Sequence, residues 1–145
     1  MQAVKEFMQS PEIWRYCAEF GADKESKTYT HGPKETWLAY TVDRKPVGLI
    51  NMHVMTGSMC QFHPYILRAY KDKYDEMVQE FFAMFAKDMQ KEVIKLNAII
   101  ATCFKGAIRA AFRAGMHQEG VDRLSFRTKD GTHDRILFGI LREEM

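Results

Sequence analysis

The spacing of hydrophobic residues changes several times along this chain, and each change marks a predicted helix or strand. Ser10, Pro11 and Glu12 are typical of a helix start, because Ser can cap, Pro fits the first turn and Glu suits the positive end of the dipole. Apolar residues then recur at helical spacing from Ile13, and Gly21 ends the run. The first clear element is therefore a short amphipathic helix.

Three strands are predicted next. Runs of β-branched and aromatic residues, separated by turn residues, predict strands over 36–42, 47–55 and 60–67. Pro64 has no N–H to donate to a neighbouring strand, so the sheet is expected to be irregular or splayed there. Residues 22–35 are polar and are predicted to form a mobile connection, while residues 1–9 are predicted to be a first strand or a loose terminus.

The second half of the chain alternates helical and strand patterns. A long amphipathic helix is predicted from about Tyr74 to Gln90, and a short buried strand at Ala98–Ala101. A second, alanine-rich helix follows and stops at Gly115, with small side chains that let it lie close to a sheet or a ligand. Its predicted apolar face consists of Ala107, Ile108, Ala111 and Phe112.

Two further strands close the chain, over 121–128 and 135–141, with the hairpin signature Asp130-Gly131 between them. Antiparallel hairpins at both ends of the order flank one crossover through a helix. The fold class indicated is α/β (an α+β mixed sheet), with a central, mostly antiparallel sheet and helices on both faces, in a single domain spanning 1–145.

Composition narrows the classes of function. The chain has 145 residues and a net charge of +2, so no dominant nucleic-acid or anionic-membrane surface is indicated. No apolar run approaches the ~18 residues of a membrane span, and the first residues lack the apolar core of a secretory signal. Three widely spaced cysteines suggest reduced thiols in a cytoplasm, and histidine and cysteine spacings show no metal site.

The order of elements over about 36–141 resembles the GNAT superfamily, the acetyl-coenzyme A-dependent N-acetyltransferases. In that family a strand ending near a His/Pro-type pair, here His63-Pro64, runs into a loop that opens a helix and holds the cofactor pyrophosphate on its backbone N–H groups. Arg68 matches the first loop position. The resemblance implies acetyl-coenzyme A as cofactor, held by Tyr65, Ile66, Leu67, Arg68, Ala69, Tyr70, Lys71, Asp72 and Lys73.

The chain also departs from the GNAT pattern. Lys71 and Lys73 stand at the two glycine positions of the loop, and Phe104 and Ala111 stand where the following helix usually has Asn and Tyr. In the family that Tyr commonly protonates the leaving thiolate. The degenerate motifs are similar to those of small GNAT-like proteins of tailed bacteriophages, some of which are assembly or virion-associated proteins. A phage-encoded chain would be expected in the host cytoplasm or the virion.

Few residues are candidates for acid–base chemistry. GNAT chemistry needs a base that takes a proton from the substrate amine. Residues 47–67 contain no Asp or Glu, so the candidate base is His53, which shares one strand face with Asn51. The alternative is a histidine with a purely structural role. Cys60 and His63 are three apart and are expected on opposite strand faces. Cys103 is either a nucleophile or a buried structural thiol.

Surface charge is open to two interpretations as well. Arg68, Lys71 and Lys73 are either an anion site or a solvated helix start. The arginines in the last third of the chain form either a face for an acidic partner or a solvated surface on which acidic residues balance their charge.

The sequence leaves two functions open. The first is an N-acetyltransferase that takes an amine-bearing substrate between the first helix and strand 47–55. The second is a non-catalytic GNAT-like module that binds a virion or host protein.

Overall fold

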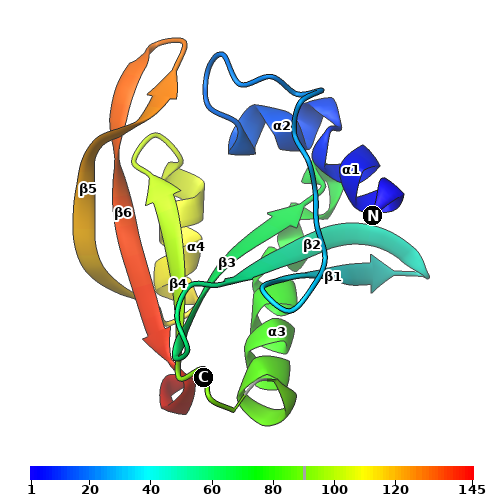
Figure 1. Ribbon diagram of the computed structural model, residues 1–145, viewed down its shortest axis with the longest axis vertical. Coiled ribbons are helices and arrows are strands. Elements are labelled where there is room, and N and C mark those ends of the chain that lie inside the picture. Colours follow the sequence, from blue (N-terminus) through cyan, green and yellow to red (C-terminus); the bar gives the residue numbers. More distant parts are fainter. Residues whose placement is uncertain (90) are drawn as a thin grey trace.

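The computed structural model describes residues 1–89 and 91–145. Six strands in these residues form one sheet in the order β1-β2-β3-β4-β6-β5 (Figure 1). The pairing of β3 with β4 is parallel and the other pairings are antiparallel. This confirms the predicted mixed, mostly antiparallel sheet. The strands are β1 (Glu35–Val42), β2 (Lys45–Val54), β3 (Met59–Ile66), β4 (Lys95–Ala101), β5 (His117–Thr128) and β6 (Gly131–Leu141).

Helices cover both faces of the sheet, as predicted. α3 (Tyr74–Asp88) and α4 (Lys105–Arg113) pack on one face, where Phe81, Phe85 and Phe138 are buried in the main core. α1 (Gln2–Met8) and α2 (Pro11–Cys17) pack on the other face, where Met8 and Ile13 form a smaller core with Leu49 of β2. No helix among the described residues is both long and apolar enough to cross a membrane.

The prediction for the N-terminus was wrong in two respects. Residues 2–8 are helical, neither a strand nor a loose terminus, because Met8 buries its side chain against Ile13 and Leu49. α2 ends at Cys17, where the backbone of Ala18 becomes extended, rather than continuing to Phe20. Pro11 does open the helix, but the Ser10 hydroxyl donates a hydrogen bond back to the carbonyl oxygen of Phe7 instead of capping α2.

Other element boundaries shift by a few residues. The strand predicted at 98–101 begins at Lys95, and the last two strands are longer at their N-terminal ends than predicted. Gly115 ends the alanine-rich helix with a positive φ of 86°, as expected. Phe112 was predicted on the apolar face of that helix, yet its side chain is 53% exposed and meets Phe138 edge-on. The predicted end of the α3 helix at Gln90 lies outside the described residues.

The predicted splay is confirmed, and it opens between β3 and β4. β3 stays paired with β2 from Cys60 to Ile66, whereas its pairing with β4 ends at Gln61, which lies beside Asn97. Beyond this point the two strands diverge (Figure 1). Pro64 lies within the diverging part and has no N–H with which to continue the ladder.

An arginine close to the C-terminus caps the end of α3. Arg142, in the short 3-10 helix η2 (Arg142–Glu144), donates hydrogen bonds to the carbonyl oxygens of Phe85, Ala86, Met89 and Val93. Its guanidinium also lies 4.3 Å from the centre of the Phe85 ring. The last carbonyls of a helix lack intrahelical donors, so this side chain supplies donors and a favourable charge at the negative end of the dipole.

Candidate active site

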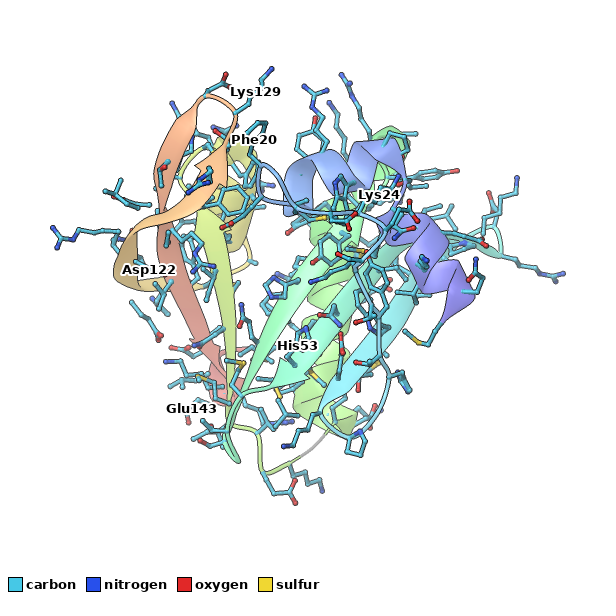
Figure 2. All side chains as sticks on the ribbon, turned by 45° about the horizontal axis from the view of Figure 1, so that its top comes forward. Phe20, Lys24, His53, Asp122, Lys129 and Glu143 are labelled. Carbon is cyan, nitrogen blue, oxygen red and sulfur yellow. The ribbon has the colours of Figure 1, made fainter. Side chains whose placement is uncertain are left out.

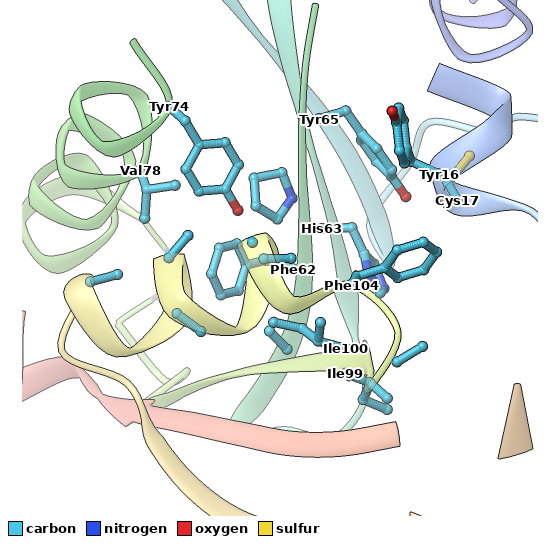
Figure 3. A pocket seen from close by; sticks show the side chains of 18 of the residues that line it. Tyr16, Cys17, Phe62, His63, Tyr65, Tyr74, Val78, Ile99, Ile100 and Phe104 are labelled. Atoms are coloured by element: carbon cyan, nitrogen blue, oxygen red, sulfur yellow. The ribbon is translucent and has the colours of Figure 1, made fainter. Parts of the chain in front are cut away.

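The splay opens a cavity of about 720 Å³ that passes from one face of the sheet to the other. On the helical face the cavity is bounded by Tyr74 and Val78 of α3 and by Ala110 of α4. On the opposite face its wall includes His63 of β3 and Ile99 of β4 (Figure 3). This size is within the usual range for sites that bind small molecules. A long ligand can therefore enter between α3 and α4 and reach the other face of the sheet.

The alanines of the α4 region explain why the helical side of this cavity stays open. Ala107, Ala110, Ala111 and Ala114 all face it. A larger side chain at any of these positions would fill the space between α4 and the sheet. The prediction that small residues let this helix lie close to a sheet or a ligand agrees with this arrangement.

A second cavity, of about 660 Å³, lies between the same strand face and the chain that follows α2. The two cavities share Cys17, His63 and Tyr65 in their walls. We call this place the junction. In the described part of the chain, the second cavity is lined by three carboxylates, from Glu19, Asp23 and Glu35, and by one lysine, Lys27. It therefore favours a positively charged ligand.

Aromatic rings form a continuous wall along the second cavity. The ring centroids of Tyr29 and Trp37 lie 5.8 Å apart, and Trp37 stacks on Tyr65 at 6.5 Å. Tyr65 stacks on His63 at 6.5 Å, and His63 meets His53 edge-on at 6.2 Å. The wall crosses β1, β2 and β3, so it joins the acidic cavity to the junction. Ring faces of this kind attract cations.

Glu35 is the carboxylate that contacts the predicted base. Its Oε1 lies 3.6 Å from Nε2 of His53 and accepts a hydrogen bond of 3.2 Å from the amide of Asn51, while its Oε2 accepts one from the hydroxyl of Thr30. The structure confirms that Asn51 and His53 share a face with the cavity. The sequence interpretation missed Glu35 because it was assigned to the polar connection. The signal that could have found it is its place in the strand, directly opposite His53 in the β1–β2 register.

Burial sets the protonation states of the groups around the cavities. Desolvation, with a smaller contribution from His53, lowers the pKa of His63 to about 4, so this ring is neutral near pH 7. Desolvation raises the pKa of Tyr74 to about 12 and also raises the pKa of Tyr65. Both hydroxyls are therefore protonated and able to donate. Burial likewise raises the pKa of the Cys17 thiol, which makes it a poor nucleophile.

The predicted cofactor loop lies at one edge of the large cavity. Tyr65 and Ile66 line the cavity, and Leu67 precedes the 3-10 helix η1 (Arg68–Lys73). The backbone N–H of Arg68 donates a long hydrogen bond of 3.4 Å to the carboxylate of Glu12. The remaining residues from Ala69 to Lys73 do not line the cavity. That they hold a pyrophosphate stays a prediction.

The three cationic side chains of this loop differ in their contacts. Lys73 pairs with Glu76 at 2.8 Å, while Arg68 and Lys71 are exposed. Glu76 is also bonded by the hydroxyl of Tyr40, and Asp75 pairs with Arg113 of α4 at 2.9 Å. Glu76 thus offsets part of the loop's positive charge, while Asp75 is engaged by α4.

The other candidates of the sequence divide between core and cavity. Cys60 is fully buried on the helical face and His63 lies on the opposite face, as predicted, so they do not pair. Cys103 lines the large cavity. Among the arginines, Arg135 pairs with Asp122 and Arg113 with Asp75. Within residues 1–89 and 91–145, no group of three or more histidine, cysteine or acidic side chains is arranged to bind a metal.

Known proteins share this fold at low sequence identity. No protein-family model matches the sequence, and no curated protein matches it. Among solved structures, spermidine N-acetyltransferase from Vibrio cholerae, in complex with CoA and spermine, matches with a TM-score of 0.80 and 13% identity, over 99% of this chain and 90% of that one. The ribosomal-protein-S18-alanine N-acetyltransferase from Escherichia coli matches with a TM-score of 0.72 and 15% identity, over 88% and 81%. The chain thus has the fold of the GNAT acetyltransferases.

Proposed function

We propose that the chain is an N-acetyltransferase that uses acetyl-coenzyme A as donor and an amine as acceptor. One observation carries this proposal: the cavity that passes through the splay meets an acidic, aromatic cavity at Cys17, His63 and Tyr65. Two substrates that enter from opposite faces of the sheet would meet there. Two matching structures support the same pair of substrates: one is a complex with CoA and spermine, and the other is a ribosomal-protein-S18-alanine N-acetyltransferase.

The large cavity fits the coenzyme. Its apolar channel between α3 and α4 suits a long, flexible arm, and His63 and Tyr65 would lie beside the thioester. The turn from Arg68 to Lys73 follows Tyr65 and Ile66, which line this channel, and its lysines and backbone would hold the pyrophosphate. Acetyl-coenzyme A supplies an activated acetyl group, and its transfer to an amine releases the thiol.

The second cavity would bind and deprotonate the acceptor. Its carboxylates attract the ammonium form of an amine, and the ring wall of Trp37 and Tyr65 offers faces for the cation. The amine must lose a proton before it can attack. His53 would accept this proton through a water molecule, and the carboxylate of Glu35, 3.6 Å from its Nε2, would stabilise the resulting imidazolium.

Proton donation to the leaving thiolate needs another group, because Ala111 stands where the family has a tyrosine. Tyr65 and Tyr74 both line the large cavity and keep their protons at neutral pH. Either hydroxyl would serve as the donor. The phenol that gives up its proton would recover one from water as the products leave.

Calorimetry and thermal unfolding with acetyl-coenzyme A test the proposal. Ligand at 100 times its dissociation constant should stabilise the fold by about 2.7 kcal/mol. A panel of small amines then tests for turnover, measured as release of the free thiol. Absence of both heat and stabilisation at millimolar acetyl-coenzyme A would refute the proposal.

A second candidate function rests on the loop itself. The N–H of Arg68 is bonded to Glu12, and Lys73 is paired with Glu76, so these groups have partners within the chain. This favours a non-catalytic GNAT-fold module that binds a virion or host protein, as the resemblance to phage proteins implies. A co-purified partner that is retained when Arg68, Lys71 and Lys73 are replaced by Ala would support this function.

A further inference from the structure

Part of the wall of the large cavity is apolar and lies on the face of the sheet opposite α3 and α4. We call it the apolar branch and define it by Ile99, Ala101, Cys103, Phe104 and Phe126. Ile99 and Ala101 alternate along β4 with the core residues Ala98 and Ile100, so they lie on the face opposite α3 and α4. The branch therefore begins on the same face as the junction and extends toward β5 and β6.

Aromatic contacts and a backbone hydrogen bond connect the residues of the branch to α2 and to the β5–β6 hairpin. The rings of Tyr16 and Phe104 meet edge-on at 6.5 Å, and those of Phe104 and Phe126 at 5.5 Å. Beside them, the N–H of Phe20 donates a hydrogen bond of 2.9 Å to the carbonyl oxygen of Arg127. Figure 2 shows Phe20 next to the β5–β6 hairpin, which turns at Lys129. The segment after α2 is thus attached to the hairpin beside these rings.

The chemistry of the branch differs from that of the acidic cavity. Its defining side chains are apolar or a thiol, and the guanidinium of Arg135, which also lines the cavity, is engaged by Asp122 and Ser125 at 2.9 Å each. A cationic acceptor would gain nothing here, whereas the acidic cavity on the other side of the junction suits it. The side chains of the branch suit an apolar group that begins at the junction, where the acyl carbonyl would lie.

We propose that the apolar branch holds the acyl chain of the donor, so that the protein accepts a series of coenzyme A thioesters, of which acetyl-coenzyme A is the shortest, and binds the longer ones more tightly. This inference rests on the proposed function, because it assumes that a coenzyme A thioester occupies the large cavity. From the junction on β3 to Phe104, which follows β4, the branch spans roughly one strand spacing widened by the splay, about 5–10 Å. Straight acyl chains of about four to eight carbons would fill that length.

Binding of a series of thioesters to the intact chain tests the inference without knowledge of the acceptor. Calorimetry is carried out with coenzyme A, acetyl-, butyryl-, hexanoyl-, octanoyl- and dodecanoyl-coenzyme A. Each added methylene should tighten binding by roughly two- to fourfold up to about eight carbons, the upper figure corresponding to ~0.8 kcal/mol per buried methylene. Affinity should level off or fall for dodecanoyl-coenzyme A, which is longer than the branch.

Replacement of Ile99 by Trp would fill the branch, and Ile94→Trp is the matched control. Ile94 also lies beside β4, but it is 55% exposed and lines neither cavity. Ile99→Trp should lower the ratio of octanoyl to acetyl affinity at least tenfold and leave the affinity for coenzyme A within twofold. Ile94→Trp should change neither. If Ile99→Trp does not fold by circular dichroism, Cys103→Leu replaces it.

The outcomes separate this inference from the proposed function. If neither coenzyme A nor any thioester binds, the proposed function fails. If coenzyme A and acetyl-coenzyme A bind with affinity that does not rise with chain length, or if Ile99→Trp keeps the full gain, the acyl-chain inference fails while the proposed function stands. An apolar tail on the acceptor would then be the occupant of the branch.

Discussion

Acidification should destabilise this protein through His63, the histidine at the junction of the two cavities. Its pKa is about 4 in the fold, against an ordinary value of 6.5, because burial disfavours the charged ring. The unfolded chain therefore binds a proton near pH 6.5, while the folded chain binds it only near pH 4. The contribution to stability is fully present above pH 6.5 and is lost as the pH falls toward 4.

The size of this effect follows from the two pKa values. At pH 4.5 the unfolded chain's preferential binding of the proton lowers the free energy of unfolding by about 2.5 kcal/mol, at ~1.36 kcal/mol per pKa unit. Because the ring borders cavities that water can enter, we expect a smaller loss of about 2 kcal/mol between pH 7.5 and 4.5. Replacement of His63 by Gln removes this titration, so the variant should lose about 2 kcal/mol less over the same range.

Urea unfolding at pH 7.5, 6.5, 5.5 and 4.5 measures the effect for the wild type and for His63→Gln. Other groups that titrate in this range are common to both proteins and cancel in the difference. His31→Gln, at an exposed position, is the matched control and should follow the wild-type curve. Equal losses of stability in the wild type and His63→Gln, or a His63 pKa near 6.5 by nuclear magnetic resonance, would refute the argument.

Three further predictions concern the cap of α3 and the two cavities. Arg142→Met should lower the free energy of unfolding by about 2–3 kcal/mol in urea, because four carbonyl oxygens lose charged donors; a loss below about 0.5 kcal/mol would contradict the capping role. Glu35→Gln should reduce kcat/KM for amine acceptors by at least about tenfold with unchanged coenzyme affinity by calorimetry, and an unchanged kcat/KM would exclude the role given to this carboxylate. Ala111→Trp should abolish stabilisation by coenzyme A in thermal unfolding, whereas Ala83→Trp, at an exposed position on α3, should retain it.

Local patterns in the sequence were sufficient for most of the fold. The strands 36–42, 47–55 and 60–67 were predicted to within two residues, since β-branched and aromatic runs between turns specify them locally. Pro64 indicated the splay, because a proline cannot continue a ladder on both sides. The hairpin at Asp130-Gly131 and the helix stop at Gly115 likewise depend on a few adjacent residues.

Features that depend on contacts distant in sequence were missed. α1 is short, and Met8 is buried because β2 supplies Leu49 to receive it, which no local pattern reveals. Glu35 was assigned to a loop, and only the register of β1 with β2 places it beside His53. The ring wall combines side chains from three strands and the connection before them. The resemblance to phage proteins stays a prediction.

The most direct test of the account is a crystal structure of the chain with coenzyme A. We predict electron density for the pantetheine arm between α3 and α4, passing the splay between β3 and β4, with the thiol at the junction beside His63 and Tyr65. A coenzyme bound elsewhere on the surface, or a chain that crystallises without it at millimolar concentration with the splay closed by side chains, would contradict the account.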